Sequence, residues 1–117
     1  MRLSSRDTVE PFETKDGSTI RELLGMQHGT ANQSLAEATL EPGQATQRHY
    51  HARSEELYVL LEGGGEMEID GARHRVGPGE AILIPPGARH QITAAEALLR
   101  FLCCCAPPYS HDDTYFD

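Results

Sequence analysis

Hydrophobic positions along the chain recur with the two-residue period of β-strands, and no sustained helical period of 3.6 residues is present. Short apolar runs are bounded by Gly, Pro and Asp turn signals. The pattern predicts strands at residues 19–24, 34–40, 56–61, 81–84 and 97–105, and a hairpin at residues 66–76. The dipeptide Asp70-Gly71 marks the hairpin turn. An all-β fold of two sheets is therefore expected.

The last strand is the least obvious of these, because residues 94–100 favour helix by local propensity. We still expect a strand from about Ala97 to Cys105, since tertiary context routinely overrides such propensity. The three consecutive cysteines, Cys103 to Cys105, are interpreted as small apolar core residues of a protein in a reducing compartment. A redox or thiol-ligand role is the alternative.

The 117 residues are enough for one domain with flanking segments. Residues 1–18 are expected to form a loosely structured N-terminal arm, residues 19–106 the barrel, and residues 107–117 a C-terminal tail. A solvated terminus is the plain expectation for the tail. The alternative is a tail that folds against the barrel and places Tyr109 or His111 at an opening.

Two predicted strands, within residues 57–61 and 81–84, are apolar on both faces. Strands without alternation need cover on both sides. In a barrel of this size the outer cover is most simply another subunit, so we predict a homodimer packed through sheet faces.

Charge and composition exclude some partners. The chain has 10 Lys and Arg against 18 Asp and Glu, a net charge of −8, which argues against a nucleic-acid or anionic-membrane partner. The N-terminus lacks an apolar signal-like stretch, and no segment approaches the roughly 20 apolar residues of a membrane span. A cytoplasmic protein is expected.

Four side chains have the chemistry and spacing of metal ligands. His49 and His51 are two residues apart, so on an extended strand both imidazoles point to the same side. The next strand brings Glu56 back alongside them, and the turn that contains Pro85 and Gly87 directs His90 inward. Imidazoles and a carboxylate suit a divalent transition metal.

These residues also carry a family resemblance. The chain resembles the cupins, whose first motif, G-x5-H-x-H-x(3,4)-E-x6-G, is matched by Gly43, His49, His51, Glu56 and Gly63. Their second motif, G-x5-P-x-G-x2-H-x3-N, is matched by Gly79, Pro85, Gly87 and His90, with Ala94 in place of the final Asn. Glu55 fits the looser spacing, but only Glu56 leaves six residues before Gly63.

The resemblance implies a double-stranded β-helix, or jelly-roll barrel, with one divalent transition metal per subunit. The metal could be Mn, Fe, Ni, Zn or Cu, and the implied ligands are His49, His51, Glu56 and His90. Small single-domain cupins of this kind are often likened to mannose-6-phosphate isomerase.

Such a site suggests a metal-dependent isomerase or lyase that acts on a small sugar or on a hydroxy or uronic acid. A non-catalytic binding or sensing protein and an iron-dependent oxygenase are the alternatives. Tyr58 lies two residues past Glu56 and should point into the cavity, where it is a candidate catalytic group. The plainer expectation is that it fills the core as an aromatic side chain. In the tail, His111 is a second catalytic candidate and Tyr109 a candidate substrate-binding residue. Arginines gather near the motifs, which favours a small polar or anionic ligand: Arg48, Arg53 and Arg89.

Overall fold

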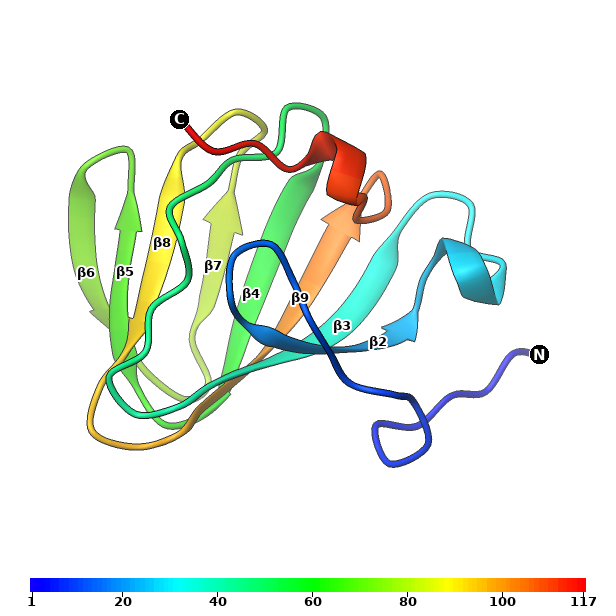
Figure 1. Cartoon of the computed structure of the whole chain (residues 1–117), viewed down its shortest axis with the longest axis horizontal. Coiled ribbons are helices and arrows are strands. Elements are labelled where there is room, and N and C mark those ends of the chain that lie inside the picture. The colour runs from blue at the N-terminus through cyan, green and yellow to red at the C-terminus, as the bar shows by residue number, and fades with distance from the viewer.

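Two antiparallel sheets face each other in the computed structural model, which describes residues 1–117 (Figure 1). The larger sheet has the order β1 (Phe12–Glu13), β2 (Thr19–Leu24), β3 (Ser34–Leu40), β9 (Leu99–Ala106), β4 (Glu55–Glu62) and β7 (Ala81–Ile84). The smaller has the order β6 (Ala72–Val76), β5 (Gly65–Ile69) and β8 (His90–Ala94). The only helical elements are the 3-10 turns η1 (Met26–His28) and η2 (His111–Asp113). The predicted all-β jelly-roll barrel is confirmed.

Most strands follow the sequence pattern, but β1 and β8 were not predicted. Strands β2, β3 and β7 have the predicted bounds. The hairpin turns at Asp70-Gly71, where both residues have positive φ angles of 48° and 88°, as a tight two-residue connection requires. Strand β9 begins at Leu99 and pairs with both β3 and β4. Its position between two strands explains why helical propensity is overridden there.

The segment between β3 and β4 differs from the prediction. We expected His49 and His51 on a strand, but residues 41–54 run as an extended chain held by isolated bridges. His49 exchanges both backbone hydrogen bonds with His90, whereas Tyr50 does so with Tyr115 of the tail. Because the chain changes its hydrogen-bonding partner between two adjacent residues, no continuous ladder forms.

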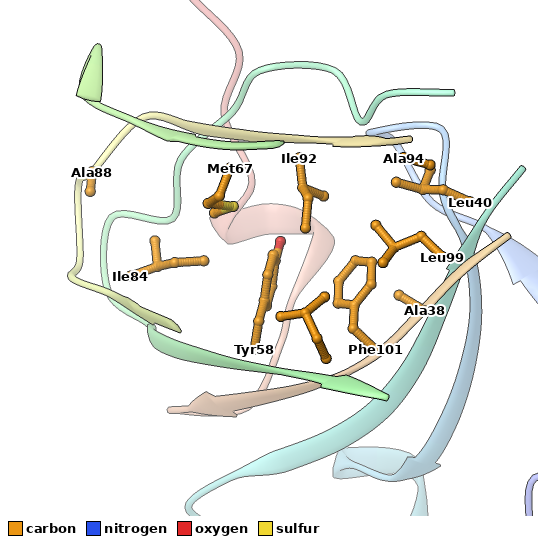
Figure 2. Close-up of a cluster of buried hydrophobic side chains, with 11 residues drawn as sticks. Ala38, Leu40, Tyr58, Met67, Ile84, Ala88, Ile92, Ala94, Leu99 and Phe101 are labelled. Carbon is orange, nitrogen blue, oxygen red and sulfur yellow. The ribbon is translucent and has the colours of Figure 1, made fainter. Parts of the chain in front are cut away.

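The core lies between the two sheets (Figure 2). Strands β3, β4, β7 and β9 of the larger sheet contribute most of its side chains, and Met67, Ile92 and Ala94 of the smaller sheet close it from the other side. Ile92 and Leu99 are completely buried. This packing occupies the barrel next to the histidines, since the ring of Tyr58 lies 6.3 Å from that of His90.

One motif glycine has a clear structural reason. Gly63 has a φ of +74°, and a Cβ at this position would lie 2.1 Å from the carbonyl oxygen of Leu98. Only glycine accommodates both the left-handed conformation and the close backbone approach. The end of strand β4 therefore depends on this residue.

The N-terminal arm is better anchored than the sequence suggested. Strand β1 pairs with β2, and the guanidinium of Arg6 contacts Glu37 at 3.1 Å. Glu37 is a buried carboxylate that also pairs with Arg100. Since a buried carboxylate needs such partners, the arm is drawn onto the sheet.

The C-terminal tail also folds against the barrel, as the alternative expectation stated. Tyr115 pairs with Tyr50 through the backbone, and their rings stack at 5.2 Å. Asp113 and Thr114 are buried. In Figure 1 the tail crosses the end of the barrel beside the segment that carries His49.

Neither helical turn, η1 or η2, has the length or the apolar character of a membrane-spanning helix.

The outer face of β4 and β7 is apolar and exposed. Its leucines and valine, Leu57, Val59, Leu61 and Leu83, expose 37–54% of their surface. Contiguous apolar patches of this kind commonly mark interfaces. The homodimer packed through sheet faces stays a prediction, and this face is where we expect it.

Light scattering at micromolar concentration should give twice the subunit mass. The double change Leu57→Glu and Leu83→Glu should yield monomers, because it places charges inside the expected interface. His74→Glu, on the exposed strand β6 of the other sheet, is the matched control and should remain dimeric. A monomeric wild-type protein contradicts the prediction.

Candidate metal centre

Three buried imidazoles meet at one end of the barrel. The potential ligand nitrogens of His49, His51 and His90 lie within 4.8 Å of one another. The backbone pairing of His49 with His90 brings their rings to 4.3 Å, and His51 follows on the same side with its ring 5.0 Å from that of His49. These residues could hold a metal ion.

Each imidazole is oriented by a backbone carbonyl. The Nδ1 atoms lie at hydrogen-bonding distance from carbonyl oxygens in three pairs: His49 with Gln47 at 2.7 Å, His51 with Asp113 at 3.1 Å, and His90 with Ala88 at 2.9 Å. A carbonyl only accepts, so Nδ1 carries the proton in each neutral ring. The Nε2 lone pairs are then free, as in metal-ligating histidines.

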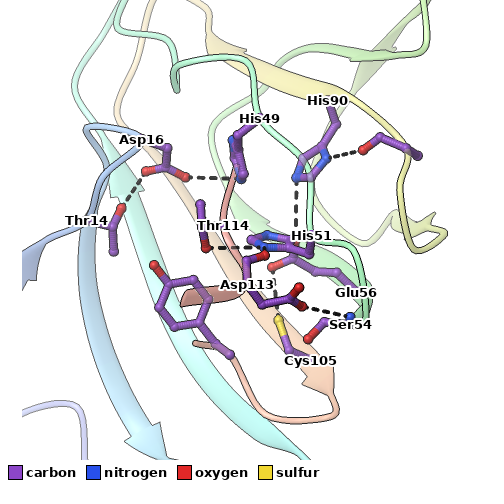
Figure 3. Close-up of polar contacts among 12 residues, drawn as sticks. Thr14, Asp16, His49, His51, Ser54, Glu56, His90, Cys105, Asp113 and Thr114 are labelled. Carbon is purple, nitrogen blue, oxygen red and sulfur yellow. Dashed lines mark hydrogen bonds and ion pairs between the residues drawn. The ribbon is translucent and has the colours of Figure 1, made fainter. Parts of the chain in front are cut away.

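Glu56 completes the cluster from strand β4. Its Oε1 atom lies 3.4 Å from Nε2 of His51 and 3.5 Å from Nε2 of His90. Its other oxygen, Oε2, accepts a hydrogen bond from the thiol of Cys105 at 3.3 Å. Figure 3 shows Glu56, His51 and His90 pointing toward one another.

The chemistry of this cluster fits a bound cation. Oε1 of Glu56 and Nε2 of His90 are buried and have no hydrogen-bond partner. With Nδ1 protonated, both atoms present lone pairs to each other, and such an arrangement is costly unless a proton or a metal lies between them.

In the pKa values of the cluster, the effect of burial is opposed by the interactions between Glu56 and the imidazoles. Burial alone would raise the pKa of Glu56, but the interactions with His51 and His90 hold it well below its usual range. Burial lowers the pKa of His51, but the close approach of the Glu56 carboxylate, whose Oε1 atom lies 3.4 Å from Nε2, outweighs this and raises it. Burial and the neighbouring His90 lower the pKa of His49. One shared proton on His51 therefore neutralises the carboxylate.

Cys105 has a role that the sequence did not indicate. Burial and the nearby Glu56 carboxylate raise the pKa of its thiol, so it stays protonated and donates to Glu56. Cys103 lines the same cavity, and all three cysteines are free. In addition to the expected packing of the cysteines, Cys105 therefore makes a polar contact at the site.

Asp16 is a second carboxylate at the site that sequence reasoning missed. Its Oδ1 atom accepts hydrogen bonds from Thr14 and from the backbone and side chain of Ser18. Its Oδ2 atom lies 3.6 Å from Nε2 of His49. In the sequence, Asp16 followed by Gly17 is typical of a turn, and no spacing rule relates it to the histidines. The N-terminal arm therefore reaches the centre.

Asp113 is a further residue that sequence reasoning missed, and it joins the tail to His51. Its side chain is buried and accepts backbone N–H groups of Ala52, Arg53 and Ser54 at 3.1–3.2 Å. Its own carbonyl oxygen is the partner of His51 Nδ1. The tail thus fixes both the loop after His51 and the orientation of the ring.

The space in front of the histidines is small. The cavity measures about 40 Å³, room for a water molecule or two. Asp16, Glu56, Tyr58 and Tyr109 are among its lining residues. Burial raises the pKa of Tyr58 well above its usual value and that of Tyr109 to about 12.

The other predicted site residues lie elsewhere. His111 is outside this cavity, where its Nδ1 atom pairs with the Tyr109 hydroxyl at 3.0 Å. The three arginines near the motifs do not line the cavity either. They pair with carboxylates instead: Arg48 with Glu68, Arg53 with Asp113, and Arg89 with Asp117.

Two facing antiparallel sheets with three buried imidazoles between them define a β-barrel with a possible metal site. Residues 36–105 match the family model described as the Cupin domain. This is more than half of the chain, and the chain belongs to the cupin family.

Similar proteins agree with this assignment. The uncharacterized protein MJ1618 of Methanocaldococcus jannaschii is 46% identical over 110 residues, which cover 92% of this chain and 88% of that protein. The polyketide cyclase RemF from Streptomyces resistomycificus is 30% identical, with a TM-score of 0.78 over 91% of this chain and 79% of RemF. KdgF from Halomonas sp. has a TM-score of 0.81 over 92% of this chain and 94% of its own, but at 18% identity it shows the fold alone.

Removal of the Asp113 side chain should weaken metal binding. Asp113→Ala deprives three backbone N–H groups of their acceptor and loosens the carbonyl that orients His51, so we expect about 10- to 100-fold lower metal affinity. Competition with a chromophoric chelator measures this. Asp112→Asn changes the exposed neighbouring carboxylate and is the matched control. Equal affinities for both variants would remove Asp113 from this role.

The pH dependence of stability should differ between metal-free and metal-loaded protein. The raised pKa of His51 stabilises the metal-free fold below the unfolded-state pKa of about 6.5, and this contribution is lost as the pH rises through the folded-state pKa. The melting temperature of chelator-treated protein should therefore fall as the pH rises from 6.5. Bound metal displaces that proton, so the melting temperature of loaded protein should not fall in this range.

Variants test the assignment of this pH dependence. Glu56→Gln should flatten the metal-free profile, because it removes the carboxylate that raises the pKa of His51. His74→Gln changes an exposed histidine and should leave the profile as it is. The assignment fails if the profile of Glu56→Gln keeps the wild-type slope.

Proposed function

We propose that this protein is a metal-dependent enzyme, an isomerase or lyase, that catalyses proton transfer next to a carbonyl group of a small sugar or hydroxy acid. One divalent transition metal would be held by three imidazoles and one carboxylate: His49, His51, His90 and Glu56. The observation that carries the proposal is the buried contact of Glu56 Oε1 with Nε2 of His51 and Nε2 of His90. Oε1 and the His90 nitrogen have no hydrogen-bond partner.

A bound divalent ion would supply Lewis acidity, which polarises a carbonyl and acidifies a hydroxyl group. The ligand set is one that Mn, Fe, Ni, Zn and Cu accept. The protein contributes the orientation of the imidazoles through Gln47, Ala88 and Asp113. Its cavity of about 40 Å³ leaves little room for water beside a ligand.

The groups that would handle protons are side chains of the cavity wall. Oδ2 of Asp16 faces the cluster and takes no part in the hydrogen bonds that fix Oδ1, so it would accept a proton or a hydrogen bond from the ligand. The hydroxyls of Tyr58 and Tyr109 would donate, since burial raises the pKa of both phenols and keeps them protonated. An acceptor and donors in one small space are what an isomerase or lyase needs.

A cyclase reaction is the second candidate. The similarity to the polyketide cyclase RemF favours it, and closure of a carbon ring in a polyketone also begins with loss of a proton beside a carbonyl. The cavity of about 40 Å³ favours the smaller reacting group of the first candidate. For location we propose a reducing compartment such as the cytoplasm, supported by three free thiols.

Elemental analysis of untagged protein purified without chelators should show about one transition metal per subunit. His90→Ala should abolish this occupancy, and Glu56→Gln should lower the affinity, because it removes the anionic ligand. The matched controls are His74→Ala and Glu55→Gln, both exposed. Full occupancy of the His90→Ala variant contradicts the proposed centre.

The identity of the metal then directs the activity assay. Manganese, nickel, zinc or copper leads to isomerase and lyase assays on sugars and hydroxy acids, in which Asp16→Asn should lose turnover while it retains metal. Iron together with oxygen consumption would replace the proposal with an oxygenase. Protein that is metal-free and cannot be loaded would be a binding or sensing protein instead.

A further inference from the structure

An open groove lies outside the barrel, next to the metal cavity. It measures about 830 Å³ and is formed by residues 8–12 of the arm, by Met26–His28 and by residues 109–112 of the tail. The inner cavity is some twenty times smaller. A ligand larger than a few atoms therefore has room only if part of it lies in this groove.

Two side chains belong to the walls of both spaces: Glu22 and Tyr109. On the cavity side, the Tyr109 ring lies 5.9 Å from that of His51. On the groove side, its hydroxyl contacts Nδ1 of His111 at 3.0 Å. Glu22 accepts a hydrogen bond from Gln27, at 2.9 Å. Glu22 and Tyr109 thus border both the groove and the metal cavity.

The charges along this path have one sign. The groove wall carries the carboxylates of Glu10, Glu22 and Asp112, and it contains no Lys or Arg side chain. The cavity wall adds Asp16 and Glu56, again without Lys or Arg.

No Lys or Arg side chain lines the groove or the cavity. The Lys15 ammonium lies beside the groove, where it donates to the carbonyl oxygen of His111 at 3.1 Å, but it is not part of either wall. The arginines that suggested an anionic ligand pair with carboxylates away from the cavity. A negatively charged group in the groove would meet like charges without compensation, which disfavours binding.

We propose that the groove is an extended ligand subsite of the metal centre and that it takes an uncharged or cationic polar molecule. The chelating end of this molecule reaches the histidines past Glu22 and Tyr109, and the remainder lies along the acidic groove wall. The inference rests on the proposed function, and it narrows the substrate to molecules whose distal part carries no negative charge.

A set of hydroxamates tests this on the cobalt(II)-loaded full chain. Three probes share the chelating group and an alkyl linker of equal length, and they end in a hydroxyl, an ammonium or a carboxylate group. Acetohydroxamate is the short reference. Binding is followed by the visible absorption of cobalt at pH 8, where carboxylates are charged and free imidazoles are not. We expect the carboxylate-ended probe to bind about ten-fold more weakly than the hydroxyl-ended probe, and the ammonium-ended probe several-fold more tightly.

Removal of two of the three groove carboxylates, with Glu22 kept because it also lines the cavity, should level most of this order. In the double variant Glu10→Gln and Asp112→Asn the three long probes should bind within about two-fold of one another, with acetohydroxamate unchanged. The double variant Glu41→Gln and Glu96→Gln removes the same number of exposed charges outside the groove and should keep the order.

Failure of the groove subsite and failure of the metal centre give different results in this experiment. If acetohydroxamate binds but the three long probes bind alike in the wild type, the groove is not a subsite and the inference is overturned. If cobalt does not load, or no hydroxamate perturbs its spectrum, the proposed metal centre itself fails.

Discussion

The structure depends on one constraint: three imidazoles and a carboxylate are buried together and must all be satisfied. Each Nδ1 atom has a backbone carbonyl partner, which leaves Nε2 lone pairs directed at an anionic oxygen. Such a cluster is unfavourable without a proton or a cation at its centre. The barrel supplies the carbonyls, the backbone pairing of His49 with His90, and the Cys105 thiol behind Glu56. Its local geometry is therefore that of a centre prepared for a cation.

Both ends of the chain are tied to this centre. Asp16 of the N-terminal arm lies beside His49, and Asp113 of the C-terminal tail orients His51 and binds the loop that follows it. Neither residue belongs to the region that matches the cupin family model. The barrel accounts for the imidazoles, whereas the arm and tail determine what surrounds them.

The cavity wall contains carboxylates but no Lys or Arg side chain, whereas the surface outside it carries both. The arginines near the motifs are held by carboxylates outside the cavity, and the wall that faces the histidines is acidic, hydroxylic or apolar. Low dielectric within a closed space strengthens each of these interactions. The exposed carboxylates of the groove act more weakly, because solvent screens them. Both effects act against negative charge on the part of the ligand that does not bind the metal.

The sequence by itself indicated most of the strands and the hairpin turn at Asp70-Gly71, because alternation and turn chemistry are local properties. It did not indicate β1 or β8. Residue spacing and the cupin motifs together pointed to His49, His51, Glu56 and His90. The sequence also indicated that Tyr58 faces the cavity. Only the tertiary structure decided that Asp16 and Asp113 reach the site, that His111 lies outside it and that the arginines are paired elsewhere. These positions follow from contacts between segments as far apart as 62 residues, which no local pattern records.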